Sequence, residues 1–201
     1  MLTTPSTTLS EFLGGVIADP VKHARFLNTL SLLEHIGSRK ILLTQGETGG
    51  EDALKHLAEE TRHAHFFRKA AEKVAGRPLT YSDQDAAAPH SARMYFGRLD
   101  SGISAETGPG ALAYLYVTQA IEVRAHGVYG LYEKELRAAG HSLTLRSVIA
   151  EEDAHLAAME AALRRLDPRY GERSARFAAL EAELFCVWLA KTAAACGVDS
   201  Q

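Results

Sequence analysis

Cysteine is scarce in this chain, and its scarcity excludes two classes of metal site. The only two cysteines are Cys186 and Cys196. Ten residues apart on one predicted helix, they lie ~15 Å apart along its axis, too far to form a disulfide with each other. No Cys-x-x-Cys pair occurs, so the sequence encodes neither a zinc ribbon nor a rubredoxin-type iron site.

Long apolar runs and an excess of basic charge are also missing. The longest apolar stretches, such as LFCVWLA at residues 184–190, are far shorter than the roughly 20 residues of a membrane span. The formal net charge of -3 argues against a dedicated nucleic-acid surface. The first residues, MLTTPSTTLSEFLGG, show neither the basic nor the apolar region of a signal peptide. We therefore expect a cytoplasmic protein that binds neither nucleic acid nor membrane.

The feature that is abundant is the apolar periodicity of helices. Hydrophobic residues make up 46% of the chain and charged residues 23%, as in ordinary globular proteins, and 201 residues suit one domain. Apolar residues recur at helical spacing along most of the chain, and no stretch alternates as a strand would. The sequence thus predicts a single all-α domain over residues 1–201.

Glycine and proline mark the ends of the predicted helices, at Gly76, Pro78, Gly140, Pro168 and Gly197. The predicted helices cover approximately residues 8–18, 21–44, 52–75, 110–139, 142–166 and 172–195. A glycine-rich turn, GETGGED at residues 46–52, joins the second of these helices to the third.

The lengths of the connections predict how the long helices pair. Short turns join 21–44 to 52–75 and 110–139 to 142–166, so each pair should form an antiparallel hairpin. We interpret the long segment between the hairpins, residues 76–109, as a crossover with a short helix at 89–99, or as a lid. Two hairpins and one crossover predict a four-helix bundle over about residues 21–166. The helix at 172–195 is an addition that caps the bundle or pairs with a second subunit.

Each of the four long helices carries a glutamate on its own apolar stripe. These glutamates are Glu34, Glu60, Glu122 and Glu152. Two of them are followed, three residues later and on the same helix face, by His63 and His155. A buried ionised carboxylate costs several kcal/mol unless it is paired or bound to metal, and these stripes offer no lysine or arginine. Two divalent ions would neutralise the four carboxylates, and oxygen-rich ligation with one imidazole per ion suits iron or manganese.

This pattern resembles the di-iron carboxylate proteins of the ferritin-like superfamily, which use one glutamate from each of two helices and a Glu-x-x-His motif from each of the other two. The matching motifs occur in the same order along the chain. The resemblance implies a ferritin-like four-helix bundle with an additional C-terminal helix, holding two iron ions, or manganese, or one of each. The implied metal ligands, some of them bridging, are Glu34, Glu60, His63, Glu122, Glu152 and His155.

The resemblance also implies a redox enzyme, an oxidase or oxygenase that activates dioxygen or peroxide and acts on an unknown small-molecule substrate. Because the chain lacks a rubredoxin module, a separate electron donor or a self-contained peroxidase-like cycle is implied, and we expect a homodimer. Three alternatives remain open at this point. They are a ferroxidase or iron-storage protein, a haem-oxygenase-like di-metal oxygenase, and a metal-free helical interaction bundle.

The second hairpin presents a problem of register. Glu34 and Glu60 both lie ~14–16 Å from the turn that joins their helices, whereas the levels of Glu122 and Glu152 differ by ~12 Å. The helix at 110–139 should therefore bend near its two glycines, Gly127 and Gly130, or overhang the bundle.

Several neighbours of the predicted ligands receive a secondary interpretation. Glu59 and Glu151 are interpreted as surface residues, although a register error of one would exchange them with the ligands beside them. His126 and Asp153 are candidates for orienting the ligands. Tyr129 is interpreted as a packing residue.

Overall fold

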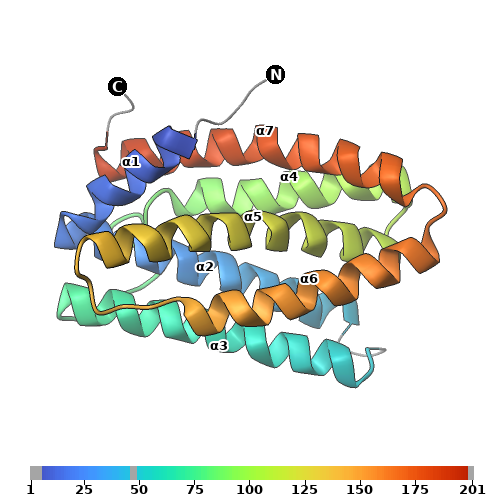
Figure 1. The fold of residues 1–201 in the computed structure, drawn as a ribbon, viewed down its shortest axis with the longest axis horizontal. Helices are drawn as coiled ribbons and strands as arrows, with labels where there is room; N and C mark the ends of the chain where they lie inside the picture. Colours follow the sequence, from blue (N-terminus) through green and yellow to red (C-terminus); the bar gives the residue numbers. More distant parts are fainter. Residues whose placement is uncertain (1–5, 46–48, 199–201) are drawn as a thin grey trace.

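The computed structural model of the protein describes residues 6–45 and 49–198, and every regular element within these ranges is an α-helix. The helices are α1 (Ser6–Ile17), α2 (Pro20–Gln45), α3 (Glu51–Ala75), α4 (Pro89–Thr107), α5 (Ala111–Ala138), α6 (Arg146–Leu166) and α7 (Tyr170–Cys196). The all-α prediction is confirmed for this part of the chain (Figure 1). Residues 46–48 of the predicted glycine-rich turn lie outside the described residues. Among the helices described, none is both long enough and apolar enough to cross a membrane.

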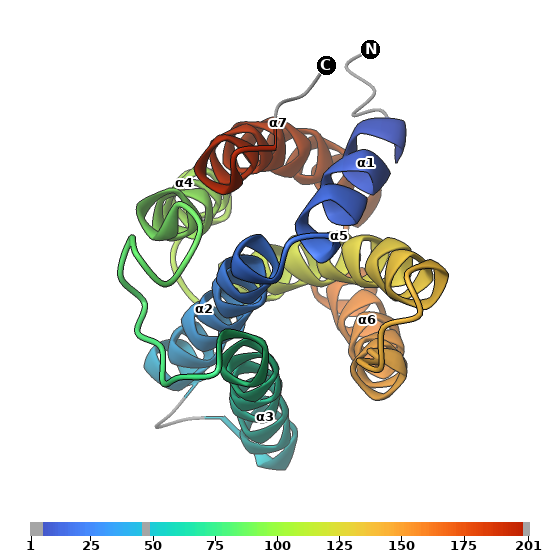
Figure 2. The ribbon, with the colours of Figure 1, turned by 90° about the vertical axis from the view of Figure 1, so that its left-hand side faces the viewer.

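The long helices run lengthwise in three layers (Figure 2). The middle layer holds α2 and α5, the layer below it α3 and α6, and the layer above it α4 and α7, with α1 at one end (Figures 1 and 2). Helices α2 and α3 are antiparallel neighbours, as are α5 and α6 (Figure 1). The two predicted hairpins are therefore present, and a further helical layer covers them.

The segment 76–109 departs most from the sequence prediction. It contains a helix of 19 residues, α4, rather than the short one expected at 89–99. Pro89 begins this helix, at a position where its missing N–H group costs nothing. Leu99 and Ile103 are fully buried, so α4 is part of the core and the interpretation as a lid is wrong.

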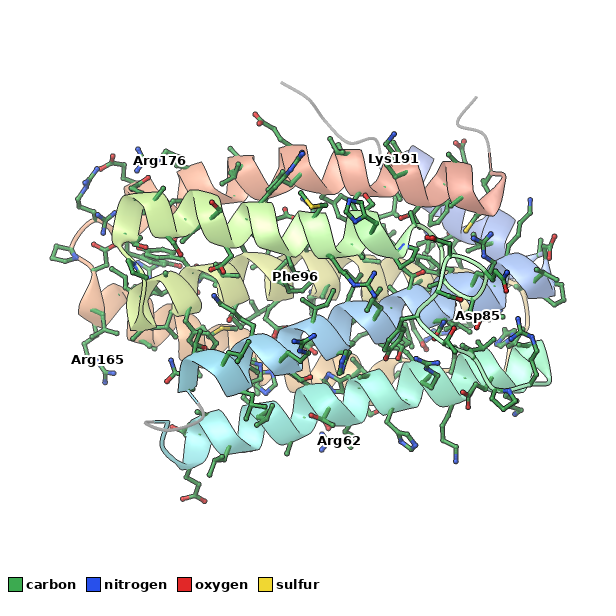
Figure 3. The ribbon with its side chains drawn as sticks, turned by 180° about the vertical axis from the view of Figure 1, so that it is seen from behind. Arg62, Asp85, Phe96, Arg165, Arg176 and Lys191 are labelled. Atoms are coloured by element: carbon green, nitrogen blue, oxygen red, sulfur yellow. The ribbon has the colours of Figure 1, made fainter. Side chains whose placement is uncertain are left out.

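The loop that precedes α4, residues 76–88, is anchored by Asp85 (Figure 3). Arg77 Nη2 donates to Asp85 Oδ1 over 2.6 Å, and the backbone N–H of Thr80 donates to Oδ2 over 2.8 Å. These hydrogen bonds lower the pKa of Asp85 to about 2. From α2, the side chain of Asn28 donates to the carbonyl groups of Thr80 and Asp85. The loop is thus tied to the middle layer.

The C-terminal helix α7 packs against α4 and α5 of its own chain. Phe177, Phe185 and Trp188 are each at most 3% exposed. Val187 of the same helix is 52% exposed. The helix begins at residue 170 and ends at 196, slightly beyond the predicted limits.

The register problem of the second hairpin is solved by an overhang. Helix α5 is continuous through Gly127 and Gly130 and ends at Ala138. Helix α6 begins only at Arg146, four residues later than predicted. Residues 139–145 return along the bundle between them (Figure 1), and an extended segment of this length can span roughly 23 Å. The return brings α6 to the level at which Glu122 and Glu152 interact directly.

Candidate metal centre

The six residues predicted as metal ligands converge between the middle layer and the layer of α3 and α6. Helix α2 contributes Glu34, α5 contributes Glu122, and α3 and α6 each contribute a Glu-x-x-His motif. The four glutamates and His63 are each at most 7% exposed, and the side chain of His155 is 14% exposed. The apolar stripes therefore do place these polar groups inside the protein.

The donor atoms fall into two sets of four that share Glu60. The Glu34 set consists of Glu34, Glu60, His63 and Glu152, and the His56 set of His56, Glu60, Glu122 and His155. Within each set, one donor atom per residue lies within 4.8 Å of all the others. Donors about 2.1 Å from a common divalent ion lie at most about 4.2 Å apart, so each set is close to the size that one ion requires. The shared Glu60 occupies the place of a bridging carboxylate.

His56 is the member of these sets that the sequence analysis missed. Its Nε2 atom lies 3.3 Å from Glu122 Oε1 and 3.5 Å from Glu60 Oε1, and its side chain is 12% exposed. Its ring centroid is 4.3 Å from that of His155. The available signal was the spacing of four between His56 and Glu60, which puts both side chains on one face of α3.

Glu59 and Glu151, interpreted from the sequence as surface residues, bind the two histidines instead. His63 Nε2 lies 2.7 Å from Glu151 Oε2, and His155 Nε2 lies 2.7 Å from Glu59 Oε2. The arrangement is reciprocal: Glu59 of α3 binds the histidine of α6, and Glu151 of α6 binds the histidine of α3. A carboxylate acceptor holds the imidazole proton on Nε2 and leaves Nδ1 directed at the cluster.

The other neighbours also differ from their sequence interpretation. His126 and Asp153 bind each other over 3.0 Å at the surface, with side chains 39% and 65% exposed, so their geometry does not indicate that they orient ligands. The hydroxyl group of Tyr129 donates a hydrogen bond to Glu34. Tyr129 is therefore more than a packing residue.

Crowding of the carboxyl groups raises two of their pKa values. Burial, followed by the charges of Glu60 and Glu152, raises the pKa of Glu34 well above its ordinary value. Burial and the charge of Glu60 act in the same way on the pKa of Glu122. For Glu152, burial is outweighed by contacts with Glu122 and with the two histidines, and its pKa is lowered. Protons thus occupy part of the cluster when no cation neutralises it.

The two histidines of the motifs have raised pKa values. Burial alone would lower the pKa of His155, but the neighbouring carboxylates of Glu152 and Glu59 outweigh it and raise the pKa to about 9. The pKa of His63 is raised against the effect of burial by Glu152 and Glu151. The negative charges of the carboxylates around both imidazole rings therefore favour a cation between them.

Four buried polar atoms at the centre of the cluster lack a hydrogen-bond partner among the described residues. They are Glu60 Oε1, His63 Nδ1, Glu152 Oε2 and His155 Nδ1; of these, His63 Nδ1 is in ion-pair contact with Glu152 Oε1 at 3.1 Å, without the geometry of a hydrogen bond. Buried polar atoms are rarely left unsatisfied in folded proteins. Carboxylate oxygen and imidazole nitrogen are donors that suit iron and manganese. The residues present therefore fit a pair of divalent cations.

Gly37 on α2 provides the space that Glu60 occupies. A Cβ atom at position 37 would lie 2.8 Å from Glu60 Oε2, closer than van der Waals contact allows. A glycine in the middle of a helix costs about 0.5–1 kcal/mol relative to alanine. The helix accepts this cost because a side chain at position 37 would meet the Glu60 carboxylate.

Two cavities reach the cluster from opposite layers. A small, mostly apolar cavity of about 50 Å³ adjoins Glu34, Glu60 and Glu122 from the side of α4 and α7. A wider pocket of about 350 Å³, bounded by α3, α5 and α6, reaches His56 and His155. The cluster thus has a small, mostly apolar cavity on the side of three carboxylates and a wider pocket on the side of His56 and His155.

Comparison with known proteins assigns no family. No protein-family model matches the chain, and no match is found among the curated proteins or among the solved structures.

Proposed function

We propose that this protein is a di-metal carboxylate redox enzyme with a ferritin-like bundle, which activates dioxygen or peroxide as an oxidase or oxygenase. The observation that carries the proposal is the pair of donor sets sharing Glu60, with buried donor atoms that have no hydrogen-bond partner. Two antiparallel hairpins that contribute their donors in the order Glu, Glu-x-x-His, Glu, Glu-x-x-His support the same assignment.

Each ion would have its own donor set and one common ligand. Glu34, His63 and Glu152 would hold one ion, His56, Glu122 and His155 would hold the other, and Glu60 would serve both. The metals proposed are two iron ions, or manganese, or one of each, because these suit mixed carboxylate and imidazole ligation. When bound, such ions supply the electrons and the Lewis acidity that the reduction of dioxygen or peroxide requires.

The residues of the chain prepare the site for this chemistry. Glu59 and Glu151 bind the Nε2 side of the two imidazoles, so both Nδ1 atoms face the cluster, where a metal ion would displace any proton that they carry. Tyr129 holds Glu34 by donating its hydroxyl proton to the carboxylate. The apolar walls of the 50 Å³ cavity, which include Leu30 and Val128, keep water from the carboxylate side.

Dioxygen consumption tests the proposal. Protein loaded anaerobically with two equivalents of Fe²⁺ should consume dioxygen much faster than the same Fe²⁺ in buffer, and Glu60→Ala should remove the difference because both donor sets lose a ligand. Glu160→Ala is the matched control, since Glu160 lies on α6 and pairs with Arg164 at the surface. Consumption no faster than that of free Fe²⁺, by protein that has taken up the iron, would contradict the proposal.

A ferroxidase, in which iron itself is the substrate, is a second candidate. The open pocket against His56 and His155 favours it, because the two carboxylates of its lining, Asp52 and Glu59, outnumber its one lysine, Lys55, and would attract cations. Storage of iron would need a large hollow assembly, whereas the oxidase or oxygenase needs none, and we propose that it is a homodimer. Light scattering separates a dimer from such an assembly.

A further inference from the structure

A third pocket, of about 360 Å³, lies at the outer side of α2 and α4. Its apolar wall is formed by Leu32, Ile36, Leu43, Phe96 and Val117. Its polar residues include His35, Arg39, Lys40, Arg93, Tyr81 and Asp100. One carboxylate therefore faces three side chains that are permanently cationic at neutral pH.

The charges of this pocket do not cancel. Lys40 Nζ lies 2.7 Å from Asp100 Oδ1, so the only carboxylate of the lining is already paired. Arg39 and Arg93 are exposed, and neither forms an ion pair with any residue that the structure describes. Two uncompensated guanidinium groups at the rim of a pocket attract anions, and each can bind a carboxylate in a bidentate manner.

The outer pocket adjoins a cavity that reaches the candidate metal centre. A narrow cavity of about 20 Å³ shares Lys40 and Val117 with the outer pocket, and it is also lined by Glu60 and Glu122 of the cluster. The small apolar cavity beside the cluster shares Ile121 and the same two glutamates with this neck. Neighbouring cavities that share lining side chains therefore extend from the outer pocket to the carboxylates.

Phe96 borders all three cavities of this series. It comes from α4 and lies between α4 and α2 (Figure 3), and only 8% of it is exposed. A neck of about 20 Å³ holds little more than one water molecule. Anything wider must displace the Phe96 ring, which makes this side chain the gate between the outer pocket and the cluster.

We propose that this series of cavities is the substrate path of the protein and admits an organic anion with an apolar end. The anionic group pairs with Arg39 and Arg93, and the apolar end passes Phe96 toward the carboxylate cluster. That the anion is a substrate rests on the proposed function, but its binding does not require metal. The outer pocket offers both unpaired cations and an apolar wall.

Binding of octanoate to metal-free protein tests the recognition of the anion. Isothermal titration calorimetry should show saturable binding, and Arg39→Gln combined with Arg93→Gln should weaken it by at least about tenfold, because two charged hydrogen-bonding groups are lost. Arg98→Gln combined with Arg165→Gln changes the net charge equally at two exposed sites outside the pocket and should leave binding unchanged. Octanol, which lacks the charge, should bind more weakly than octanoate.

Methyl NMR tests the path itself. Octanoate should shift the methyl resonances of Val117, at the outer pocket, and of Ile121, beside the cluster, whereas butyrate should shift only those of Val117. Phe96→Ala should strengthen the response of Ile121, since the gate is removed. An unshifted Ile121 methyl group in saturating octanoate would overturn the path.

The outcomes separate this inference from the proposed function. The double variant of Arg39 and Arg93 should bind as much metal as the wild type, because neither residue belongs to a donor set. A protein that binds octanoate through these arginines but takes up no metal would keep the anion site and overturn the redox function. Wild-type protein that fails to bind octanoate, or a double variant that binds it as tightly, would overturn the anion site alone.

Discussion

The Glu34 set and the His56 set are built from the same motif but differ in donor type and in burial. The Glu34 set offers three carboxylates and one imidazole, all buried. The His56 set offers two carboxylates and two imidazoles, and both of its histidines are only partly buried. The difference arises because the His56 set has His56 where the Glu34 set has a third carboxylate, Glu152, and because a wide pocket opens beside His56.

Two donor sets assembled from repeated motifs, each drawing on both hairpins, therefore need not be chemically equal. An oxygen-rich, buried set suits manganese or iron, and a second imidazole shifts the preference of the other set toward ions that accept nitrogen ligands. An ion in the His56 set would also be the one in closer reach of solvent. We therefore expect two unequal ions rather than a symmetric pair.

The largest effect on this comparison is expected from His56→Ala. Loss of a direct ligand should weaken binding to the His56 set at least about a hundredfold, since even outer partners of ligands contribute 10–100-fold, and binding to the Glu34 set should persist. A calorimetric titration with Mn²⁺ should then show one ion per chain instead of two. His126→Ala is the control, because His126 binds Asp153 at the surface. Two unchanged binding steps in His56→Ala would show that His56 is not a ligand.

Glu59→Gln and Glu151→Gln should weaken the two sets separately. Each change replaces the carboxylate that binds one histidine, so Glu59→Gln acts on the His56 set through His155 and Glu151→Gln acts on the Glu34 set through His63. The affinity for the corresponding ion should fall about 10–100-fold. The same titration measures both variants, and an equal loss at both sets in each variant would contradict the reciprocal arrangement.

Gly37→Ala should disturb both sets at once, because the added Cβ displaces the shared Glu60. We expect roughly tenfold weaker binding of both ions, because the tip of the Glu60 side chain must move away from α2. Gly130→Ala is the control: its Cβ would meet nothing within 4 Å, and alanine should stabilise the helix by about 0.5–1 kcal/mol. Metal binding that is unchanged in Gly37→Ala would indicate that Glu60 has another way to reach the ions.

The smallest effect is a dependence on pH. Glu34, Glu122 and His155 have pKa values that are higher in the folded state than in the unfolded one, so their contributions to the free energy of unfolding decrease as pH rises. For His155 the contribution is complete below about 6.5 and is lost as pH rises through about 9. Metal ions compete with these protons, so their binding should tighten over the same range. Thermal melts of the metal-free protein and metal titrations measure the two trends, and a melting temperature that rises as pH increases from 6.5 to about 9 would contradict this assignment.

The sequence predicts those parts of the site that follow from residue spacing within a single helix. The position of Glu60 and His63 on one face follows from a spacing of three, and the overhang of α5 was one of two options set by the loop lengths. The contacts of Glu59 and Glu151 depend on how α3 and α6 face each other, which local spacing does not encode. The length of α4 was missed because its glycines and serines weaken the helical pattern, although Leu99 and Ile103 are buried in it.

The count of metal ions per chain tests the central claim most directly. Protein purified without chelators from cells supplied with iron and manganese is analysed by elemental mass spectrometry, beside Glu60→Ala and the control Glu160→Ala. We expect nearly two ions per chain in the wild type and the control, and nearly none in Glu60→Ala, because Glu60 belongs to both donor sets. A wild-type content well below one ion per chain, which reconstitution with Fe²⁺ or Mn²⁺ does not raise, would contradict it.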